Sequence, residues 1–499
     1  MNLFKRNLVA NVAGLGWSAL MGLLCIPLYI KFMGIEAFGL VGFYIMLQAA
    51  LQLLDFGLSP TMNRELARYS AQPEKAGEAR DFVRTLELGY WLLGIIIGTA
   101  VIAAAPLIAT HWIKAGAIPV DDIRHSVMMM GVLAALQWPL SFYQGGLFGL
   151  QRHVLLSGLT ITMSTFGYGG AILILLLVSP TITAYFSWQI AVSAVHVTAI
   201  TVFLWRCLPA VDRSAHFDPA LFRNIRRFAT GMSVITLLAL ILTQMDKVIL
   251  AKLLSLKMFG YYTLAGAVGN GLYVLITPMF NSIFPRFSAL AFRGEEGELK
   301  ELYHQGTQLM AVLVLPVAAV IALFSFDILL LWTGSVEISS NTSPIVSVLV
   351  IGTALNGLTN LPYALQIAHG WTKIGIYINI LLIFLLVPSI IVMTGYYGAV
   401  GAASVWVALN AVYIAIGVPL THLRLLRGEA LRWFLKDVGP PLAAAVLVTG
   451  LGRIMIASPM SPGMTVSALA MLLVCSIAMS ALAASRIRSI IAAEIIARI

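Results

Sequence analysis

Charged residues are scarce in this sequence. Only 10% of its 499 residues are Asp, Glu, Lys or Arg, whereas 60% are apolar. Soluble globular domains carry about 25% charged residues. A chain of this length with so little charge cannot be an ordinary soluble protein, which would divide into several domains with polar surfaces. The composition therefore indicates a polytopic membrane protein with little mass outside the bilayer.

Several chemical motifs are also absent. The three cysteines, Cys25, Cys207 and Cys475, are an odd number without CxxC spacing, so we expect neither a disulfide framework nor a zinc site. No G-x-x-x-x-G-K-[ST] loop occurs, which argues against an ATP-driven pump within this chain. The longest outer loops, near 111–125 and 333–343, are too short for the catalytic loop of a glycan polymerase or ligase. We therefore expect no enzyme, no catalytic residues, no metal and no resident cofactor.

Long uncharged runs dominate the rest of the chain. A membrane-spanning helix needs about 20 mostly apolar residues, and the runs predict an all-α protein with about fourteen such helices. The predicted spans are 8–30, 38–60, 85–110, 126–149, 154–179, 183–205, 229–251, 259–284, 308–332, 344–367, 374–394, 397–420, 438–457 and 464–485. The longest connections between them, 63–84, 206–228 and 285–307, are charged and short.

Basic residues are unevenly distributed between the predicted loops. With the N-terminus in the cytoplasm, 24 of the 31 Lys and Arg residues lie on the cytoplasmic side. This asymmetry follows the positive-inside rule and predicts that both termini are cytoplasmic. It also explains the net charge of +10 without a nucleic-acid partner.

Similar local patterns recur at a nearly constant offset, as in transporters built from duplicated halves. The matches predict an N-terminal six-helix bundle at 1–206, a cytoplasmic linker at 207–228 and a second bundle at 229–420. Two additional helices at 438–485 and a cytoplasmic tail at 486–499 follow. The alternative is that Gly and basic residues recur at loop edges by topology alone. The matched pairs are Phe38-Gly39 with Phe259-Gly260, Gly149 with Gly370 and Arg152 with Lys373 at 221 residues, and Arg64 with Arg286 at 222.

Five segments together resemble the Wzx-type polysaccharide and O-antigen flippases. These proteins form the polysaccharide transporter branch of the multidrug/oligosaccharidyl-lipid/polysaccharide exporter superfamily. The resemblance extends over essentially the whole chain, including the two C-terminal helices. The segments are 26–39 (IPLYIKFMGIEAFG), 54–67 (LDFGLSPTMNRELA), 149–152 (GLQR), 244–254 (QMDKVILAKLL) and 366–375 (QIAHGWTKIG).

The resemblance implies a bacterial inner-membrane protein with a V-shaped fold of twelve helices plus two. It implies a flippase that moves undecaprenyl-diphosphate-linked oligosaccharides from the cytoplasmic to the periplasmic leaflet by alternating access coupled to an ion gradient. The coupling ion would be a proton or sodium. Expected partners are the lipid-linked substrate, membrane lipid, and a polysaccharide polymerase and chain-length regulator. The alternative function is a multidrug or small-cation antiporter of the same superfamily.

Six basic residues are candidates for binding the diphosphate or lining a cavity. Within a span a charged side chain costs about 2.5–3.5 kcal/mol or more, so Lys247 needs a partner or a function. A structural ion pair or snorkelling to the surface is its alternative. The positive-inside rule alone also explains the basic residues at inner helix ends, and interfacial anchoring explains Lys31, which could pair with Glu36. The six candidates are Lys247, Arg64, Arg152, Arg286, Lys373 and Lys31.

Three carboxylates are candidates for coupling or gating. Asp246 adjoins Lys247, and neighbouring residues on a helix point about 100° apart, so the two cannot simply neutralise each other. Asp55 and Glu87 lie near the inner ends of their spans and could share a polar patch with Arg64 and Arg84. The simpler interpretation is that Asp55 and Glu87 are interfacial charges at helix ends.

Other polar and aromatic residues in the spans are harder to interpret. Asp327 and Arg453 are lone charges on helices that the sequence cannot orient. Tyr143 and Trp138 could stack on sugar rings if they face a cavity, although Trp and Tyr are also enriched at membrane interfaces.

Overall fold

The computed structural model describes residues 3–53, 55, 58–219, 244–456 and 461–490. Within these ranges the chain is helical, and no strand is formed. Among the described residues ten helices are long and apolar enough to cross a membrane, or eleven if the bent pair α9–α10 forms one span. The prediction of an all-helical membrane protein is confirmed, whereas the count of fourteen spans stays a prediction.

The chain divides into two compact units, Met1–Gly260 and Tyr261–Ile499. The boundary therefore falls within α9, later than the predicted linker at 207–228, part of which lies outside the described residues. The helices of the first unit are α1 (Leu3–Leu53), α2 (Leu58–Ser70), α3 (Ala76–Leu107), α4 (Val120–Gly149), α5 (His153–Ser164), α6 (Gly170–Leu177) and α7 (Ile182–Cys207). Short helical turns, η1 (Pro73–Lys75), η2 (Ile108–Trp112) and η3 (Thr165–Gly169), connect or extend them.

The second unit begins within α9 (Leu256–Asn270) and ends after the two additional helices, α17 and α18. Its remaining helices are α10 (Tyr273–Arg293), α11 (Glu296–Leu323), α12 (Ser325–Thr333), α13 (Val336–Ala368), α14 (Thr372–Val412), α15 (Val418–Leu425), α16 (Ala430–Arg432), α17 (Gly439–Met455) and α18 (Pro462–Ala483). The turns η4 (Tyr413–Gly417) and η5 (Trp433–Val438) continue α14 and precede α17.

Two long helices are interrupted by glycines. Gly34 within α1 has φ of 84°, and Gly398 within α14 has φ of 59°. Such dihedrals are not helical and are most accessible to glycine, so the chain can change direction at each. Gly34 lies between the predicted spans 8–30 and 38–60, and Gly398 lies at the start of the predicted span 397–420. The breaks therefore agree with the predicted division of both helices into two spans.

Two of the predicted cytoplasmic loops are largely helical. Helix α2 continues to Ser70 and α3 begins at Ala76, and α10 continues to Arg293 before α11 begins at Glu296. Gly294 ends α10 with φ of 72°. The charged residues of the predicted loops 63–84 and 285–307 therefore lie largely on helices, because these helices extend beyond their apolar segments. A break at Phe324, which separates α11 from α12, was also missed.

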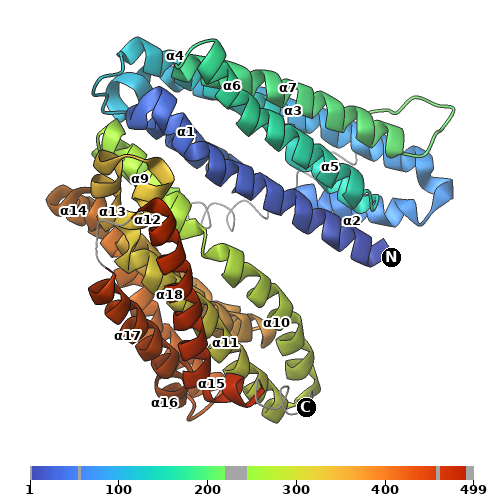
Figure 1. Ribbon diagram of the computed structural model, residues 1–499. Helices are drawn as coiled ribbons and strands as arrows, with labels where there is room; N and C mark the ends of the chain where they lie inside the picture. The colour runs from blue at the N-terminus through green and yellow to red at the C-terminus, as the bar shows by residue number, and fades with distance from the viewer. Residues whose placement is uncertain (1–2, 54, 56–57, 220–243, 457–460, 491–499) are drawn as a thin grey trace. The chain divides into compact units, whose positions relative to one another are not determined.

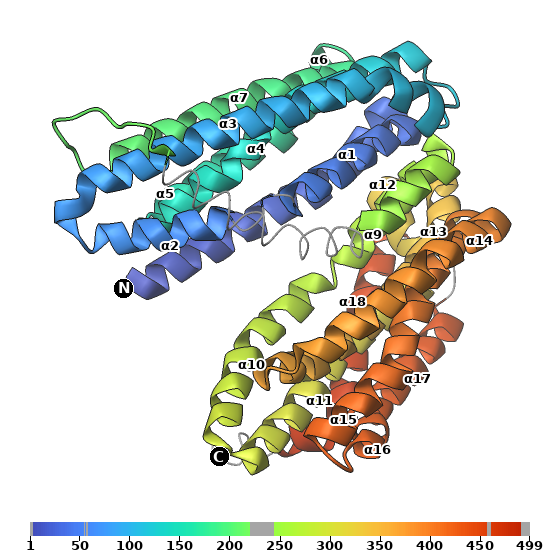
Figure 2. The ribbon, with the colours of Figure 1, turned by 180° about the vertical axis from the view of Figure 1, so that it is seen from behind.

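The helices of the first unit pack around α4. Figure 1 and Figure 2 show α3 and α7 running along it, with α2 beside its final turns. Phe142, Tyr143 and Leu147 of α4 are fully buried in this core, as is Met62 of α2. Leu92 and Ile95 of α3 are more than half exposed. Polar or close-packed faces thus point inward and apolar side chains point outward, as expected in lipid.

The glycines matched by the repeat lie in equivalent close contacts. A Cβ on Gly39 would lie 2.4 Å from the carbonyl oxygen of Leu256, and one on Gly260 would lie 2.3 Å from that of Ile35. Both contacts belong to the first unit, where the start of α9 crosses α1. Because neither contact leaves room for a side chain, the Phe38-Gly39 and Phe259-Gly260 match corresponds to a reciprocal packing of the two segments.

Candidate functional site

Close packing of α2 against α4 positions the polar residues of the first unit. A Cβ on Gly145 would lie 2.6 Å from the carbonyl oxygen of Ser59, and one on Gly149 would lie 2.5 Å from that of Asn63. Gly145 and Gly149 are four residues apart, the small-xxx-small spacing that lets helix backbones approach closely in membranes. This approach brings Asp55 and Ser59 beside α3 and α4.

Asp55 is bound entirely by neutral donors among the described residues. Its Oδ2 accepts from the backbone N–H of Ser59 at 2.9 Å. Its Oδ1 accepts from the hydroxyls of Ser59, Tyr90 and Ser141 at 2.8, 2.6 and 3.3 Å. The bond to the backbone N–H satisfies a donor at the start of α2 that has no partner within the helix. Asp55 thus caps α2 and ties it to α3 and α4.

Glu87 lies in the core of the same unit, 5% exposed. Its Oε1 accepts from the Tyr143 hydroxyl at 2.8 Å and the Trp205 indole N–H at 3.0 Å, while Arg84 donates to Oε2 at 2.9 Å. The Trp91 indole in turn donates to the Tyr143 hydroxyl at 3.0 Å. A buried carboxylate with one cation and two further donors is fully bound, so this arrangement joins α3, α4 and α7.

The two carboxylates belong to one network of side chains. The rings of Tyr90 and Phe142 lie 4.8 Å apart, and those of Phe142 and Tyr143 lie 5.0 Å apart. Phe142 therefore separates the donor of Asp55 from the donor of Glu87. We call Asp55, Glu87, Tyr90 and Tyr143 the carboxylate network.

Arg64 does not belong to the carboxylate network, contrary to our expectation. Its guanidinium pairs with Glu65 at 2.8 Å, and its side chain is 67% exposed. Arg84 does lie beside Glu87, as predicted. The polar patch therefore contains Arg84 but not Arg64, because Arg64 pairs with the neighbouring Glu65.

Arg152 and Lys31 are exposed, and neither contacts the carboxylate network. Arg152 precedes α5 in the turn after α4, the end of the unit at which Arg64 also lies. Glu36 does not pair with Lys31. Instead its carboxylate accepts from the backbone N–H groups of Gly116 and Ala117 at 2.7 and 3.0 Å.

Asp246 and Lys247 lie in the helical segment 244–253. Lys247 donates to the side-chain oxygen of Gln244 at 3.2 Å, so its partner is on its own helix. The Oδ1 atom of Asp246 is buried and has no hydrogen-bond partner among the residues described. The two side chains therefore have different surroundings, as their helical spacing predicted, and a coupling or substrate role for either stays a prediction.

Arg286 of the second unit lines an open pocket of about 350 Å³ between α10 and α11. Arg293 lies two turns further along α10, and Glu298, Glu301 and Gln305 line the side formed by α11. Gln305 donates to Glu301 at 2.9 Å, and Glu301 also pairs with Arg486 at 2.7 Å. Within the described part of the chain no carboxylate pairs with Arg286, so its guanidinium is available to an anion.

Lys373 lies in the first turn of α14, and its side chain is outside what the structure describes. The structure also corrects its match to Arg152. In the turn after α4 the N–H of Arg152 bonds to the carbonyl of Leu147, and in the turn after α13 the N–H of Trp371 bonds to that of Gln366. These equivalent bonds are 219 residues apart rather than 221, so Trp371 occupies the position of Arg152.

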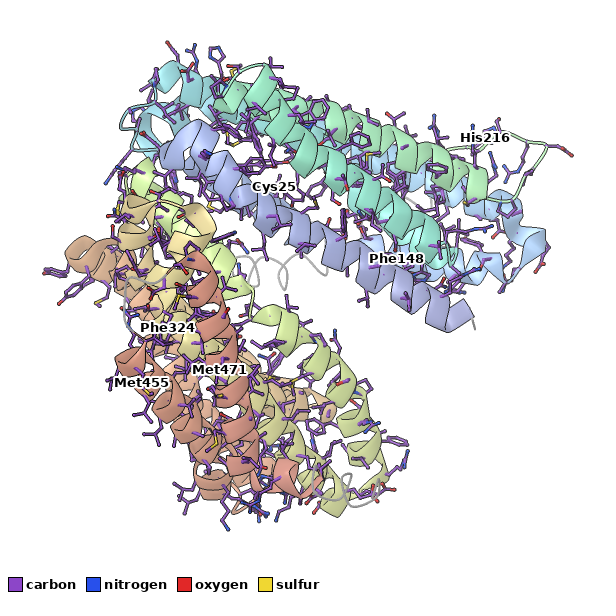
Figure 3. The ribbon with its side chains drawn as sticks, viewed as in Figure 1. Cys25, Phe148, His216, Phe324, Met455 and Met471 are labelled. Carbon is purple, nitrogen blue, oxygen red and sulfur yellow. The ribbon has the colours of Figure 1, made fainter. Side chains whose placement is uncertain are left out.

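Several residues set aside as ambiguous have definite partners. Arg453 of α17 pairs with Asp327 of α12 at 2.8 Å and lies over the ring of Phe324, which is labelled in Figure 3. Tyr143 and Trp138 are buried, and Tyr143 binds Glu87, so neither is exposed for stacking on a sugar.

Sequence reasoning missed Tyr90 as a partner of Asp55 and Trp205 as a partner of Glu87. Tyr90 and Trp91 follow Glu87 by three and four residues and share its helix face, but their bonds go to Asp55 and Tyr143 rather than to Glu87. Trp205 is more than one hundred positions away on α7, and no local pattern links it to Glu87.

The long apolar helices and the buried polar networks define a multi-pass helical membrane protein. Residues 4–291, more than half of the chain, match the sequence family described as "Polysaccharide biosynthesis protein". The chain belongs to that family, which confirms the family predicted from the sequence.

The chain is also similar to individual proteins in sequence and in fold. A "Putative O-antigen transporter" of Shigella flexneri is 20% identical over 401 residues, which cover 80% of this chain and 93% of that protein. The structure resembles the lipid II flippase MurJ in an inward closed conformation, with a TM-score of 0.70, 13% identity, and coverage of 95% of this chain and 98% of the other. It also resembles an inward-facing multidrug resistance MATE family transporter of the MOP superfamily, with a TM-score of 0.64, 17% identity, and coverage of 83% and 98%. These relatives are transporters and a flippase, in agreement with the prediction that the chain is not an enzyme.

Proposed function

We propose that this protein is a flippase for undecaprenyl-diphosphate-linked oligosaccharides. It would move these units from the cytoplasmic to the periplasmic leaflet of a bacterial inner membrane for O-antigen, capsule or exopolysaccharide biosynthesis. The observation that carries this proposal is the combination of membership in a polysaccharide biosynthesis family with a transporter fold over nearly the whole chain. The relative from Shigella flexneri supports the same cargo class.

The cargo determines what the protein must provide. Its polyprenyl tail can remain in lipid, but its diphosphate and hydrated glycan must pass the hydrocarbon layer within a polar environment. Cationic side chains that are not already neutralised suit the diphosphate. Arginine suits it best because its planar guanidinium can donate two parallel hydrogen bonds to phosphate oxygens.

Arg286 and Arg293 are therefore the proposed first contact for the diphosphate. They line one open pocket, and Arg286 has no carboxylate partner in the described residues. The carboxylate of Glu301 on the opposite wall is held by Arg486 and Gln305, which reduces its repulsion of an anion. Arg64 lies 2.8 Å from Glu65 and Arg293 lies 3.7 Å from Glu295, so Arg64 is the more fully neutralised of the two and Arg286 is the principal candidate.

The proposal includes coupling to a proton or sodium gradient and cytoplasmic termini. Asp246, Asp55 and Glu87 remain the candidate coupling residues. Asp246 has a buried oxygen without a partner in the described residues, whereas Asp55 and Glu87 are bound by several donors. A polysaccharide polymerase and chain-length regulator would act on the cargo after transfer.

An ion-coupled multidrug or small-cation antiporter is the second candidate, because the MATE family transporter shares the fold. The two candidates differ in the charge of the cargo. The pocket is lined by two arginines and two glutamates, and Arg286, which has no carboxylate partner among the described residues, favours an anionic cargo over a cationic one.

The test is leaflet exchange in proteoliposomes that contain a fluorescent undecaprenyl-diphosphate oligosaccharide. We expect the wild-type protein to accelerate exchange above the rate in empty liposomes. The double variant Arg286→Gln with Arg293→Gln should slow it about tenfold or more, because each charge-assisted bond to phosphate contributes about 1.5–3 kcal/mol. Arg488→Gln is the matched control, since Arg488 is exposed near the same end of the unit and does not line the pocket.

The outcomes separate the function from the site. Wild-type exchange equal to that of empty liposomes would contradict the flippase function. Rapid exchange by both the wild-type protein and the double variant would contradict only the assignment of Arg286 and Arg293.

A further inference from the structure

A second cluster of ionisable groups lies in the second unit, where η5 packs against α11. His304 of α11 and Asp437 of η5 are both 0% exposed. The Nδ1 atom of His304 contacts a carboxylate oxygen of Asp437, and Gln308 donates to the other oxygen at 2.9 Å. A histidine and an aspartate are therefore in direct contact at a place from which solvent is excluded.

The other ring nitrogen of His304 faces a second carboxylate. Its Nε2 atom lies 3.1 Å from an oxygen of Glu429, the residue before α16, at the distance of an ion pair but without hydrogen-bond geometry. Glu429 also pairs with Lys300 and lies 3.5 Å from Arg432. Burial disfavours the charged form of Glu429, but the hydrogen bond and charge of Lys300, with the charges of His304 and Arg432, outweigh it and lower its pKa. Glu429 therefore has positive partners besides His304.

Asp437 has no such alternative. In the described part of the chain its only bonded neighbours are His304 and the neutral amide of Gln308. A buried carboxylate without a positive partner is strongly destabilising. A neutral imidazole gives Asp437 one N–H donor only, whereas a doubly protonated His304 also supplies the positive charge that compensates the carboxylate. The described residues contain no set of three or more His, Cys, Asp or Glu side chains that could hold a metal ion instead.

The surroundings of the pair are polar rather than closed by apolar packing. His422 of α15 and Trp433 of η5 are buried, and the Nε2 atom of one and the indole nitrogen of the other have no hydrogen-bond partner in the described residues. The ring of Tyr303 packs edge-on against both His304 and His422, at 5.5 and 5.4 Å. The titratable groups in contact with the pair or with Glu429 are Lys300, Tyr303, His422 and Arg432, and the ion pair of Arg486 with Glu301 lies on the far side of Gln308.

We propose that His304, Asp437 and Glu429 form a proton-binding site that fastens the additional helices to α11. The ligand is a single proton, taken from water onto the imidazole, which then carries one positive charge between two carboxylates. Because η5 leads directly into α17, the charged pair holds the beginning of α17 against α11. When the proton leaves, Asp437 becomes an unpaired buried charge, and this end of α17 is no longer held.

Helix α18 is anchored at the same place. The backbone N–H of Arg486 donates to Gln308 at 2.9 Å, and the Arg486 guanidinium pairs with Glu301. Gln308 thus contacts both Asp437 and the end of α18. The views in Figure 1 and Figure 2 show α17 and α18 running along α11.

The other end of α17 is held by groups of a different kind. Arg453 pairs with Asp327 at 2.8 Å, and neither group is a histidine. Histidine is the side chain whose charge ordinarily changes near neutral pH, and this pair contains none. The attachment of α17 to α11 and α12 is therefore constant at one end and proton-dependent at the other.

The pH dependence follows from the proton count. In the proposed charged form the folded protein binds one more proton at this site than the unfolded chain, so a rise in pH favours unfolding. The stabilisation is therefore complete at lower pH and is lost as pH rises. Glu429 has the opposite effect on stability at more acidic pH. Its pKa is lowered in the folded protein, so the stabilisation from its charge is lost as pH falls.

The direct test is nitrogen-15 NMR of the full-length protein with labelled histidine in lipid nanodiscs at about pH 7. The His304 signal among the eight histidines is identified by its loss in His304→Gln. We expect the nitrogen shifts of a charged imidazole. Shifts of a neutral imidazole would overturn the proposal.

Thermal unfolding between about pH 6 and 9 provides the second readout. The wild-type protein should unfold at lower temperature as pH rises, and His304→Gln should unfold earlier than wild type because it leaves Asp437 unpaired. Adding Asp437→Asn to His304→Gln should restore part of the loss, because the pair is then neutral. His125→Gln, at an exposed histidine of the first unit, is the control and should keep the wild-type pH dependence.

The double variant keeps the proposal testable if His304→Gln alone fails to fold. If the double variant were no more stable than His304→Gln, the charge pairing would be wrong. A consequence for transport rests on the proposed function: leaflet exchange should slow as pH rises in wild type and lose this dependence in the double variant. Failure of exchange at every pH would count against the flippase function, while the NMR and unfolding results would stand independently.

Discussion

Glu87 and Tyr143 show how a charge is accommodated in the core of a membrane-embedded unit. The Glu87 carboxylate accepts bonds from a phenol and an indole, and it has one cation, Arg84. With these bonds in place, the ionised side chain is compensated and does not need to reach water. The network therefore joins α3, α4 and α7 through directed bonds, where lipid provides no hydrophobic driving force between helices.

The first prediction at this scale concerns Tyr143→Phe. The change removes the bond to Glu87 and the acceptor for Trp91 while keeping the ring in place. We expect a loss of about 1–3 kcal/mol in the free energy of unfolding, because the buried Glu87 loses one of its three donors and the partly buried Trp91 loses its acceptor. Chemical unfolding of the purified protein in detergent measures this loss of stability. Tyr396→Phe is the control, since Tyr396 is 81% exposed; equal stability of the two variants would contradict the role of the network.

Individual residues were predictable from the sequence only where a local pattern existed. Arg84 and Glu87 are three residues apart on one helix, and a polar patch shared by the two was one of the two interpretations of Glu87. Sugar stacking and interfacial anchoring were both open for Tyr143, because composition cannot show which side of a helix faces the core. The contact between His304 and Asp437 joins residues 133 positions apart, and the sequence gives no local sign of it.

At the scale of helices, glycine determines how closely segments approach. Gly39 and Gly260 each face a backbone carbonyl of the other segment, and a Cβ at either position would lie well inside normal contact distance. Backbone atoms cannot move aside as a flexible side chain can. The crossing of α1 and α9 therefore depends on both glycines.

We predict that Gly39→Ala and Gly260→Ala each destabilise the protein by about 1–3 kcal/mol, the usual cost of overpacking. Gly16→Ala is the matched control, because nothing lies within 4 Å of its added Cβ and alanine favours the helix. Unfolding temperature and expression level in the membrane report the difference. A Gly39→Ala protein as stable as Gly16→Ala would show that the close crossing is absent in the membrane.

The helices themselves were largely predictable, because apolar runs of sufficient length identify them. Helix α7 and the predicted span 183–205 agree to within two residues at each end. The helical breaks at Gly34 and Gly398 lie close to predicted span boundaries. The ends of helices beyond their apolar segments were not predictable. The charged segment 285–307, for example, forms the last turns of α10 and the first turns of α11. The offset of 219 residues between the turns after α4 and α13 could be found only from their backbone hydrogen bonds.

For the whole molecule, the all-helical class and the family follow from sequence patterns spread over the chain. Both are confirmed, by the helices and by the family match over residues 4–291. The attachment of the two additional helices was not foreseen. They are fixed to α11 and α12 by Arg453 with Asp327 and by Asp437 with His304, and these pairs join residues far apart in the sequence.

The central claim is that the cargo is an anionic glycolipid rather than a cationic drug. The most direct measurement follows both cargoes in the same proteoliposomes, with and without an imposed pH or sodium gradient. One reporter is the leaflet exchange of a fluorescent undecaprenyl-diphosphate oligosaccharide, and the other is the release of a cationic dye. We predict accelerated, gradient-sensitive exchange of the glycolipid and no release of the dye beyond that of empty liposomes. Dye release together with glycolipid exchange at the empty-liposome rate would contradict the account and establish the antiporter.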